Sequence, residues 1–97
     1  GWGGTVCGIS CLDGEDAANN ETTTSTNFKN GIWYSVRLRV TKNKLEAWLQ
    51  NEQIVDADTK DREIGVRIEV EESRPLGLAT FQTTAALRNI SWRKLAD

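Results

Sequence analysis

The sequence predicts an all-β fold, either an antiparallel β-sandwich or part of one. Apolar and polar residues alternate in two stretches, 32–41 and 64–71, with the period of two that is typical of a strand with one buried face. Turn-forming residues separate such stretches, and no segment of convincing length has the 3.6-residue period and capping residues of an α-helix. Short strands joined by turns are typical of sandwiches and jelly rolls.

The stretch Ile32–Val55 predicts a three-stranded meander. A two-residue turn at Lys42 and Asn43 sets the register of the first hairpin. That register pairs apolar residues on one face: Val40 with Leu45, Leu38 with Ala47 and Val36 with Leu49. A second turn at 51–52 would pair Ile54 with Leu49 and Val55 with Trp48. We expect the apolar face of this meander to lie in the core.

The outer face of the same hairpin carries charged and aromatic residues. Arg39 falls opposite Glu46 as an ion pair, and Arg37 falls opposite Trp48, where a guanidinium can stack on the indole. One register therefore satisfies both faces of the hairpin.

Three further strands are predicted outside the meander. A short one covers Thr5–Ser10, an amphipathic one covers 64–71, and a last one covers Ala86–Leu95. The stretch 11–30 is almost free of apolar residues, which predicts a long loop. Within this loop, residues 21–26 are either a solvated strand or ordered loop.

Length and composition limit the functions that are open to this chain. Its 97 residues suffice for one small domain, and the absence of methionine leads us to expect a piece of a longer protein. The net charge is -2 and the basic residues are dispersed, which argues against nucleic acid as a partner. No apolar run approaches the roughly 20 residues of a membrane span.

The two cysteines and the acidic loop residues are the candidates for cross-links or metal ligands. On a regular strand Cys7 and Cys11 would be about 13 Å apart, which favours free thiols over a disulfide unless a turn intervenes. The loop acids could supply oxygen ligands to Ca²⁺, but their spacing does not match the calcium-loop pattern. No cofactor is predicted, and a divalent cation such as Ca²⁺ stays the alternative to a solvated loop. These acids are Asp13, Glu15, Asp16 and Glu21.

Three segments carry a resemblance to a known family: Pro75–Ile90, Trp33–Val40 and Leu45–Leu49. They resemble the C-terminal half of the 3-keto-disaccharide hydrolase family, with a strand opened by Trp, a hairpin ending in a Trp-Leu turn, and a closing Gly-Leu strand followed by Arg-Asn-Ile. The resemblance covers about 32–95, and the opening Gly-Trp-Gly-Gly looks like the start of the same half in a bacterial subgroup. It implies a concanavalin A-like jelly roll. Residues 1–97 would then form a single β domain, which is the C-terminal half of a longer jelly-roll domain.

The resemblance also implies carbohydrate chemistry. Members act on glycosides whose C3 hydroxyl has been oxidised to a ketone; a base removes the acidified C2 proton, the C1 group departs and water adds afterwards. Such a site needs a base, an acid and an electrophile for the enolate oxygen, often a metal. Many members carry Gln and His where this sequence has Ala79 and Phe81. No catalytic residue is assigned, and the base is left to Glu69, Glu71 or a residue outside this chain.

The candidate sugar-binding residues project from the non-core faces of predicted strands. An indole and guanidinium groups are what pyranose recognition uses, although the pairs of the first hairpin are already explained as cross-strand partners, which favours a structural role for them. The candidates are Arg37, Arg39, Trp48, Arg67 and Glu69.

Three functions remain open. A glycoside hydrolase or lyase for 3-keto sugars would show clustered carboxylates, and a non-catalytic lectin-like sandwich would show an aromatic and Arg platform. A protein-binding β module would show an exposed apolar patch. We expect carbohydrate as the partner, self-association through unpaired strand edges, and a periplasmic or extracellular location with the signal upstream of Gly1.

Overall fold

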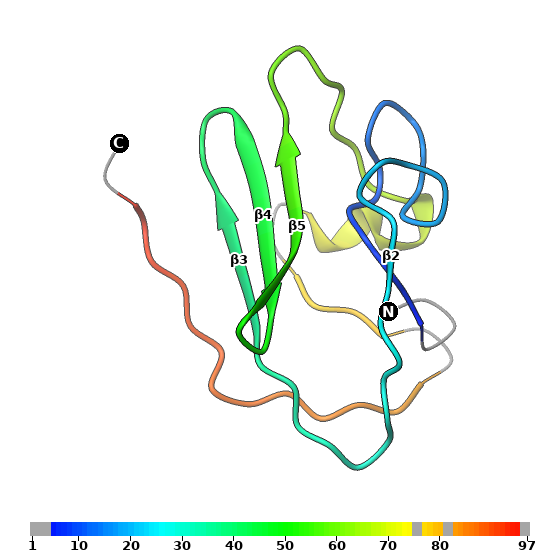
Figure 1. The fold of residues 1–97 in the computed structure, drawn as a ribbon, viewed down its shortest axis with the longest axis vertical. Coiled ribbons are helices and arrows are strands. Elements are labelled where there is room, and N and C mark those ends of the chain that lie inside the picture. The colour runs from blue at the N-terminus through cyan, green and yellow to red at the C-terminus, as the bar shows by residue number, and fades with distance from the viewer. Residues whose placement is uncertain (1–4, 75–76, 81–82, 96–97) are drawn as a thin grey trace.

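The computed structural model describes residues 5–74, 77–80 and 83–95, without the side chains of Glu69 and Ser73. Figure 1 shows two antiparallel sheets and a short 3₁₀ helix, and no α-helix occurs in these ranges. The predicted all-β class is therefore confirmed, as part of a β-sandwich. The smaller sheet pairs β1 with β2, and the larger one has the order β3-β4-β5. The elements are β1 (Val6–Cys7), β2 (Thr24–Ser25), β3 (Val36–Val40), β4 (Lys44–Leu49), β5 (Glu52–Asp58) and η1 (Ile68–Ser73).

The first hairpin has the register that the alternation predicts. The Thr41 N–H donates to the Lys44 carbonyl at 3.0 Å and closes the turn at Lys42 and Asn43. The five pairs that follow place apolar residues on one face and the charged and aromatic residues on the other. They are Val36 with Leu49, Arg37 with Trp48, Leu38 with Ala47, Arg39 with Glu46 and Val40 with Leu45.

In the second hairpin the turn predicted at 51–52 is wrong by one residue. Its turn lies one residue earlier, at Gln50 and Asn51, so that Leu49 pairs with Glu52. A β-bulge at Ile54 then shifts the register. The bulge places the buried residues Val55 and Ala57 opposite Ala47 and Leu45, on the apolar face of the sheet.

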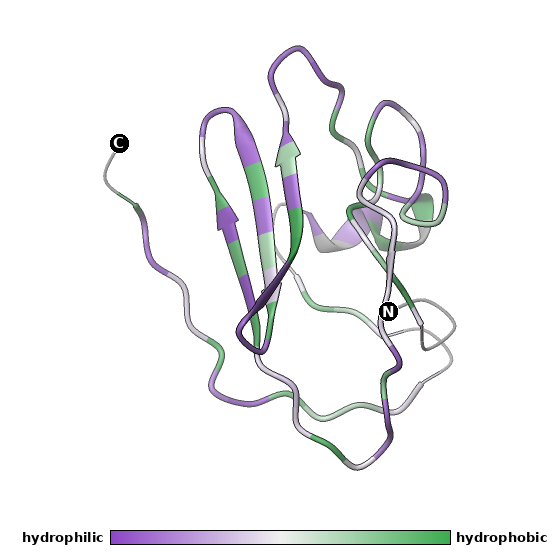
Figure 2. Cartoon of the chain, in the orientation of Figure 1, coloured by the Kyte–Doolittle hydropathy of each residue, from purple (hydrophilic) through white to green (hydrophobic). Residues whose placement is uncertain are grey.

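The hydrophobic core lies against β4 and β5 and does not extend to β3, whose apolar side chains are bare, that is, exposed to solvent. Leu12, which is fully buried, packs with Ala47, Val55 and Ala57, and Ile9 lies against this cluster. The apolar side chains of β3 are 64% to 66% exposed, so the expectation that the whole apolar face of the meander is buried is wrong for this strand. Figure 2 shows the alternation of polar and apolar residues along the bare strand. These exposed residues are Val36, Leu38 and Val40.

The predicted strand at 64–71 does not form. Gly65 and Cys11 exchange backbone hydrogen bonds of 3.0 and 2.8 Å, and Ile64 forms an isolated bridge with Leu12. After these contacts the segment pairs with no strand of the described residues, and it turns into η1, in which Ile68 is 82% exposed. A strand needs a hydrogen-bonded neighbour, and this segment has one for only two residues.

The strands predicted near the two ends of the chain, at 5–10 and 86–95, are also largely absent, because most of their residues have no hydrogen-bonded neighbouring strand among the described residues. Of the strand predicted at 5–10, only Val6 and Cys7 form a strand, and they pair with Ser25 and Thr24. The polar run 21–26 is therefore a strand at these two residues and loop elsewhere. The segment 86–95 forms no strand; Figure 1 shows it as an extended coil that leads to the C-terminus. Its apolar side chains, at Leu87, Ile90 and Trp92, are exposed.

Both cysteines are free, as the spacing favours: Cys7 is buried and Cys11 is partly buried. In the part of the chain that the structure describes, no helix is long and apolar enough to cross a membrane.

Candidate functional site

A hollow of about 310 Å³ opens on the outer face of β3 and β4, at the end where the β4–β5 turn begins. It combines a guanidinium, an indole, a hydroxyl and two amides, which together offer hydrogen bonds and an apolar surface to a sugar. Its lining residues are Ser35, Arg37, Trp48, Gln50 and Asn51. Two of the five predicted sugar-binding residues, Arg37 and Trp48, therefore meet at one site.

The two arginines of β3 play different parts beside Trp48. The Arg37 Cζ lies 4.0 Å from the centroid of the indole, and the Arg39 Cζ lies 5.2 Å from it. Arg39 also donates from Nε to the buried carboxylate of Glu46 at 2.6 Å. Arg37 has no carboxylate partner in the described part of the chain, so its N–H groups remain available to a ligand.

Gln50 fixes the end of the hollow. The Ser35 N–H donates to Gln50 Oε1 at 2.9 Å, and the Gln50 N–H donates to the Ser35 carbonyl at 2.7 Å. These bonds hold Gln50 in a left-handed conformation with φ of 56°, which starts the turn into β5. Sequence reasoning missed Ser35, Gln50 and Asn51 as lining residues, because it placed the second turn one residue too late.

The other predicted site residues do not join this hollow. Arg67 lines a second hollow, of about 350 Å³, together with Cys11, Gly14 and Asp16. There its Nη1 donates to Asp16 Oδ2 at 3.1 Å. Glu69 lies in η1, and its side chain is outside the described part of the structure.

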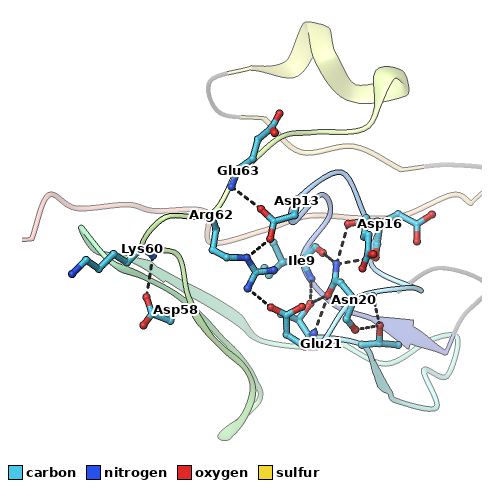
Figure 3. A network of polar contacts seen from close by, with 12 residues as sticks. Ile9, Asp13, Asp16, Asn20, Glu21, Asp58, Lys60, Arg62 and Glu63 are labelled. Atoms are coloured by element: carbon cyan, nitrogen blue, oxygen red, sulfur yellow. Dashed lines mark hydrogen bonds and ion pairs between the residues drawn. The ribbon is translucent and has the colours of Figure 1, made fainter.

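Two acids of the long loop, Asp13 and Glu21, form ion pairs with Arg62. Figure 3 shows the Arg62 guanidinium between the carboxylates of Asp13 and Glu21, both of which it contacts. A hydrogen bond from the Glu63 N–H, at 2.9 Å, and the Arg62 guanidinium lower the pKa of Asp13, while Arg62 lowers the pKa of Glu21. In return, the two carboxylates raise the pKa of Arg62 above its ordinary value.

Asn20 organises the same loop. Its amide nitrogen donates to the carbonyl oxygens of Ile9, Asp16 and Glu15 at 2.7, 2.8 and 3.1 Å. Its amide oxygen accepts from the N–H and the hydroxyl of Thr22 at 2.9 and 2.6 Å. These hydrogen bonds, which Figure 3 draws around Asn20, tie the long loop to itself and to the backbone of Ile9.

The acidic and cysteine side chains that the structure describes do not form a ligand set for a metal ion. Within the described ranges no three side chains of the types His, Cys, Asp and Glu converge on one point. Asp13 and Glu21 are paired with Arg62, and Asp16 is paired with Arg67. The hollow on β3 and β4 has no carboxylate among its lining residues.

In the closing segment, Ala79 lies in the described and exposed stretch 77–80, whereas Phe81 lies outside the described residues. The side chain of Ala79 is a methyl group, so it cannot act as an acid, a base or a hydrogen-bonding amide.

Two comparisons, with curated proteins and with solved structures, find no match to this chain. The family model described as the 3-keto-alpha-glucoside-1,2-lyase-like domain matches residues 1–93, so the match also includes the segment before the meander. The chain belongs to the family of 3-keto-alpha-glucoside-1,2-lyase-like domains.

Proposed function

We propose that the chain binds a glycoside in the hollow on the outer face of β3 and β4, and that this sugar belongs to the 3-keto-glycoside class. The observation that carries the proposal is the pairing of Arg37 with Trp48 in a hollow that also holds Ser35, Gln50 and Asn51. A flat apolar ring edge and a fork of N–H donors complement the apolar face and the oxygen atoms of a pyranose.

Four of the five lining residues have a defined part in this proposal. The Arg37 guanidinium donates hydrogen bonds to ligand oxygens, including a C3 carbonyl, because its N–H groups meet no carboxylate in the described chain. The indole of Trp48 holds that guanidinium in place by stacking, with the Arg37 Cζ 4.0 Å from the centroid of the indole ring. The Asn51 amide and the Ser35 hydroxyl offer further donors and acceptors at the rim.

The family membership supports a second candidate function, the cleavage of a 3-keto-glycoside. That reaction needs a base for the C2 proton. The residues that line the hollow include neither a carboxylate nor a histidine. Under this candidate, the hollow orients the sugar and polarises its carbonyl through Arg37, and the base comes from elsewhere in the full-length protein.

Binding is tested by titrating the chain with a 3-keto-glucoside and with the parent glucoside while backbone amide shifts are followed by NMR. We expect shifts at Arg37, Trp48 and Gln50, and an affinity about tenfold or more lower in Arg37→Gln, since a hydrogen bond from a charged donor contributes about 1.5–3 kcal/mol. Arg88→Gln is the matched control, because Arg88 stacks on Trp33 at 3.9 Å without lining the hollow. Equal losses in both variants would reject this site.

Cleavage is tested separately on the full-length protein, by incubation with a 3-keto-glucoside with and without EDTA and mass spectrometry of the products. Release of the C1 group would support the lyase or hydrolase candidate. Binding that weakens in Arg37→Gln, without cleavage by the full-length protein, would instead support a lectin-like module.

A further inference from the structure

The edge of β3 that faces away from β4 is open. In the described part of the chain β3 pairs with β4 alone. Because Thr41 donates to Lys44, the alternation of an antiparallel ladder turns the peptide groups of Arg37 and Arg39 toward β4. The N–H and C=O groups at the open edge are therefore those of Val36, Leu38 and Val40.

The side chains of the same three residues form an exposed apolar strip. They are 64% to 66% exposed, although they share a face with the buried residues Ala47 and Leu49 of β4. An added strand with apolar residues at alternate positions would extend the ladder and continue this apolar face. The strip therefore favours a strand as its occupant.

Charge decides which strand fits. Arg37 and Arg39 lie on the other face of β3, so a second β3 in antiparallel pairing about Leu38 would place Arg37 opposite Arg39. The chain's own segment 86–95 carries Arg88, Arg93 and Lys94 and no acid. Like charges opposed in this way are destabilising, so the edge selects a strand that alternates apolar with acidic residues.

The residues 68–71, Ile-Glu-Val-Glu, have that alternation. They lie in η1, which has no side-chain cap and in which the Val70 N–H donates to the Arg67 carbonyl at 3.1 Å. Ile68 is 82% exposed there. A 3₁₀ helix has poorer hydrogen-bond geometry than an α-helix, so a helix of six residues has little to lose when it becomes an extended strand with a full ladder partner.

One register matches both faces. With Ile68 opposite Val40 and Val70 opposite Leu38, all apolar side chains share the exposed face, and the open peptide groups of β3 meet those of the added strand. The same register places Glu71 opposite Arg37 and residue Glu69 opposite Arg39. Each arginine is thus opposite an acid.

Residues 68–71 lie away from the open edge of β3 in their own molecule. Figure 1 shows η1 on the β5 side of the larger sheet, whereas the open edge of β3 is on the far side of β4. We propose that the chain self-associates by adding residues 68–71 of one copy, as an antiparallel strand, to the β3 edge of a second copy. The interaction depends on the opposition of Arg37 and Glu71.

Charge reversal tests the pairing, with the mass measured by size-exclusion chromatography and light scattering over a range of concentrations. We expect the wild type to self-associate, and Arg37→Glu and Glu71→Lys each to remain monomeric, because each places like charges opposite each other. An equimolar mixture of the two variants recovers association, since Glu at 37 then meets Lys at 71 and Arg37 meets Glu71. Glu72→Lys is the control, because no acid is needed at that position.

A monomeric wild type at the highest soluble concentration would overturn the proposal, as would association of both single variants at the wild-type level. Hydrogen exchange of the unmodified chain gives an independent test. The amides of Leu38 and Val40 should become protected as concentration rises. Protection of these amides in the monomer would show that the segment 86–95 of the same molecule covers the edge, and would also overturn the proposal.

Discussion

The carboxylate of Glu46 is buried at the centre of the outer face, and Arg39 is the residue that compensates its charge. Arg39 Nε donates to Glu46 Oε2 at 2.6 Å, while Lys44 Nζ is 4.0 Å from the other carboxylate oxygen. Only 7% of the surface of Glu46 is exposed. This pair occupies Arg39 and leaves Arg37 as the guanidinium of β3 that can meet a ligand.

Removing Arg39 should therefore cost more than an exposed ion pair would. In Arg39→Gln the Glu46 carboxylate keeps only the distant Lys44, and we expect a loss of about 1–3 kcal/mol in the free energy of unfolding, measured by urea denaturation. Arg39→Gln/Glu46→Gln should recover part of this loss. The comparison is Lys44→Gln, which removes an exposed pair with Asp56 and only a 4.0 Å contact with Glu46, and which should cost about 1 kcal/mol or less. Equal effects in the two single variants would contradict the assignment.

Acid should destabilise the chain through Arg62. The pKa values of Asp13 and Glu21 are lowered in the folded chain, from ordinary values of 3.8 and 4.5. Their contribution to stability is therefore complete above these ordinary values and is lost as pH falls through the lowered ones. We expect thermal unfolding to shift downward below about pH 4.5.

Arg62→Gln should flatten that pH dependence, because the guanidinium is a main cause of both shifts. Part of the dependence should persist, since the Glu63 N–H still donates to Asp13. Arg74→Gln, which removes a loose contact with Glu71 at 3.9 Å, is the control and should leave the profile unchanged. An Arg62→Gln profile as steep as that of the wild type would refute this account.

Asn20 should be the residue on which the order of the long loop depends. Asn20→Ala removes an amide that satisfies three carbonyl groups and accepts twice from Thr22. We expect a loss of about 1–3 kcal/mol by urea denaturation, with faster hydrogen exchange at Ile9 and Thr22. Asn19→Ala, which removes a single exposed bond to Asp16, should cost about 0.5 kcal/mol or less.

The same substitution at two leucines should distinguish the covered part of the sheet from the bare strand. Leu12 is fully buried against Ala47 and Val55, so Leu12→Ala should lower the free energy of unfolding by about 2–5 kcal/mol. Leu38 is 65% exposed, and Leu38→Ala should cost about 1 kcal/mol or less in dilute solution. Comparable losses at low concentration would mean that β3 is covered in the monomer.

The first hairpin could be predicted in full because its information is local. Alternation and a two-residue turn specify which residues face each other, and both faces agree on one register. The pair of Arg37 and Trp48 follows from that register. The second hairpin could not be predicted to the residue, because the bulge at Ile54 is favoured by the burial of Val55 against a loop that is distant in sequence.

The rest of the site was beyond local reasoning. Ser35 and Gln50 line the hollow because they close the end of the β3–β4 ladder with two hydrogen bonds, and that depends on the position of the second turn. Arg67 shared the same pattern signal as Arg37, but it lies against Asp16 in another hollow. The alternation of polar and apolar residues indicates on which face of a strand a side chain lies, but it does not indicate which other segments lie beside that face.

The sequence by itself determined the all-β class, the register of the first hairpin and the residues of each of its faces, since these depend on periodicity and on one short turn. Only the tertiary structure decided that the loop of Leu12 covers β4 and β5, that β3 stays bare, and that residues 68–73 form a 3₁₀ helix. The physical reason is that a strand is completed by hydrogen bonds and packing from distant segments, and such partners leave no trace in the local pattern.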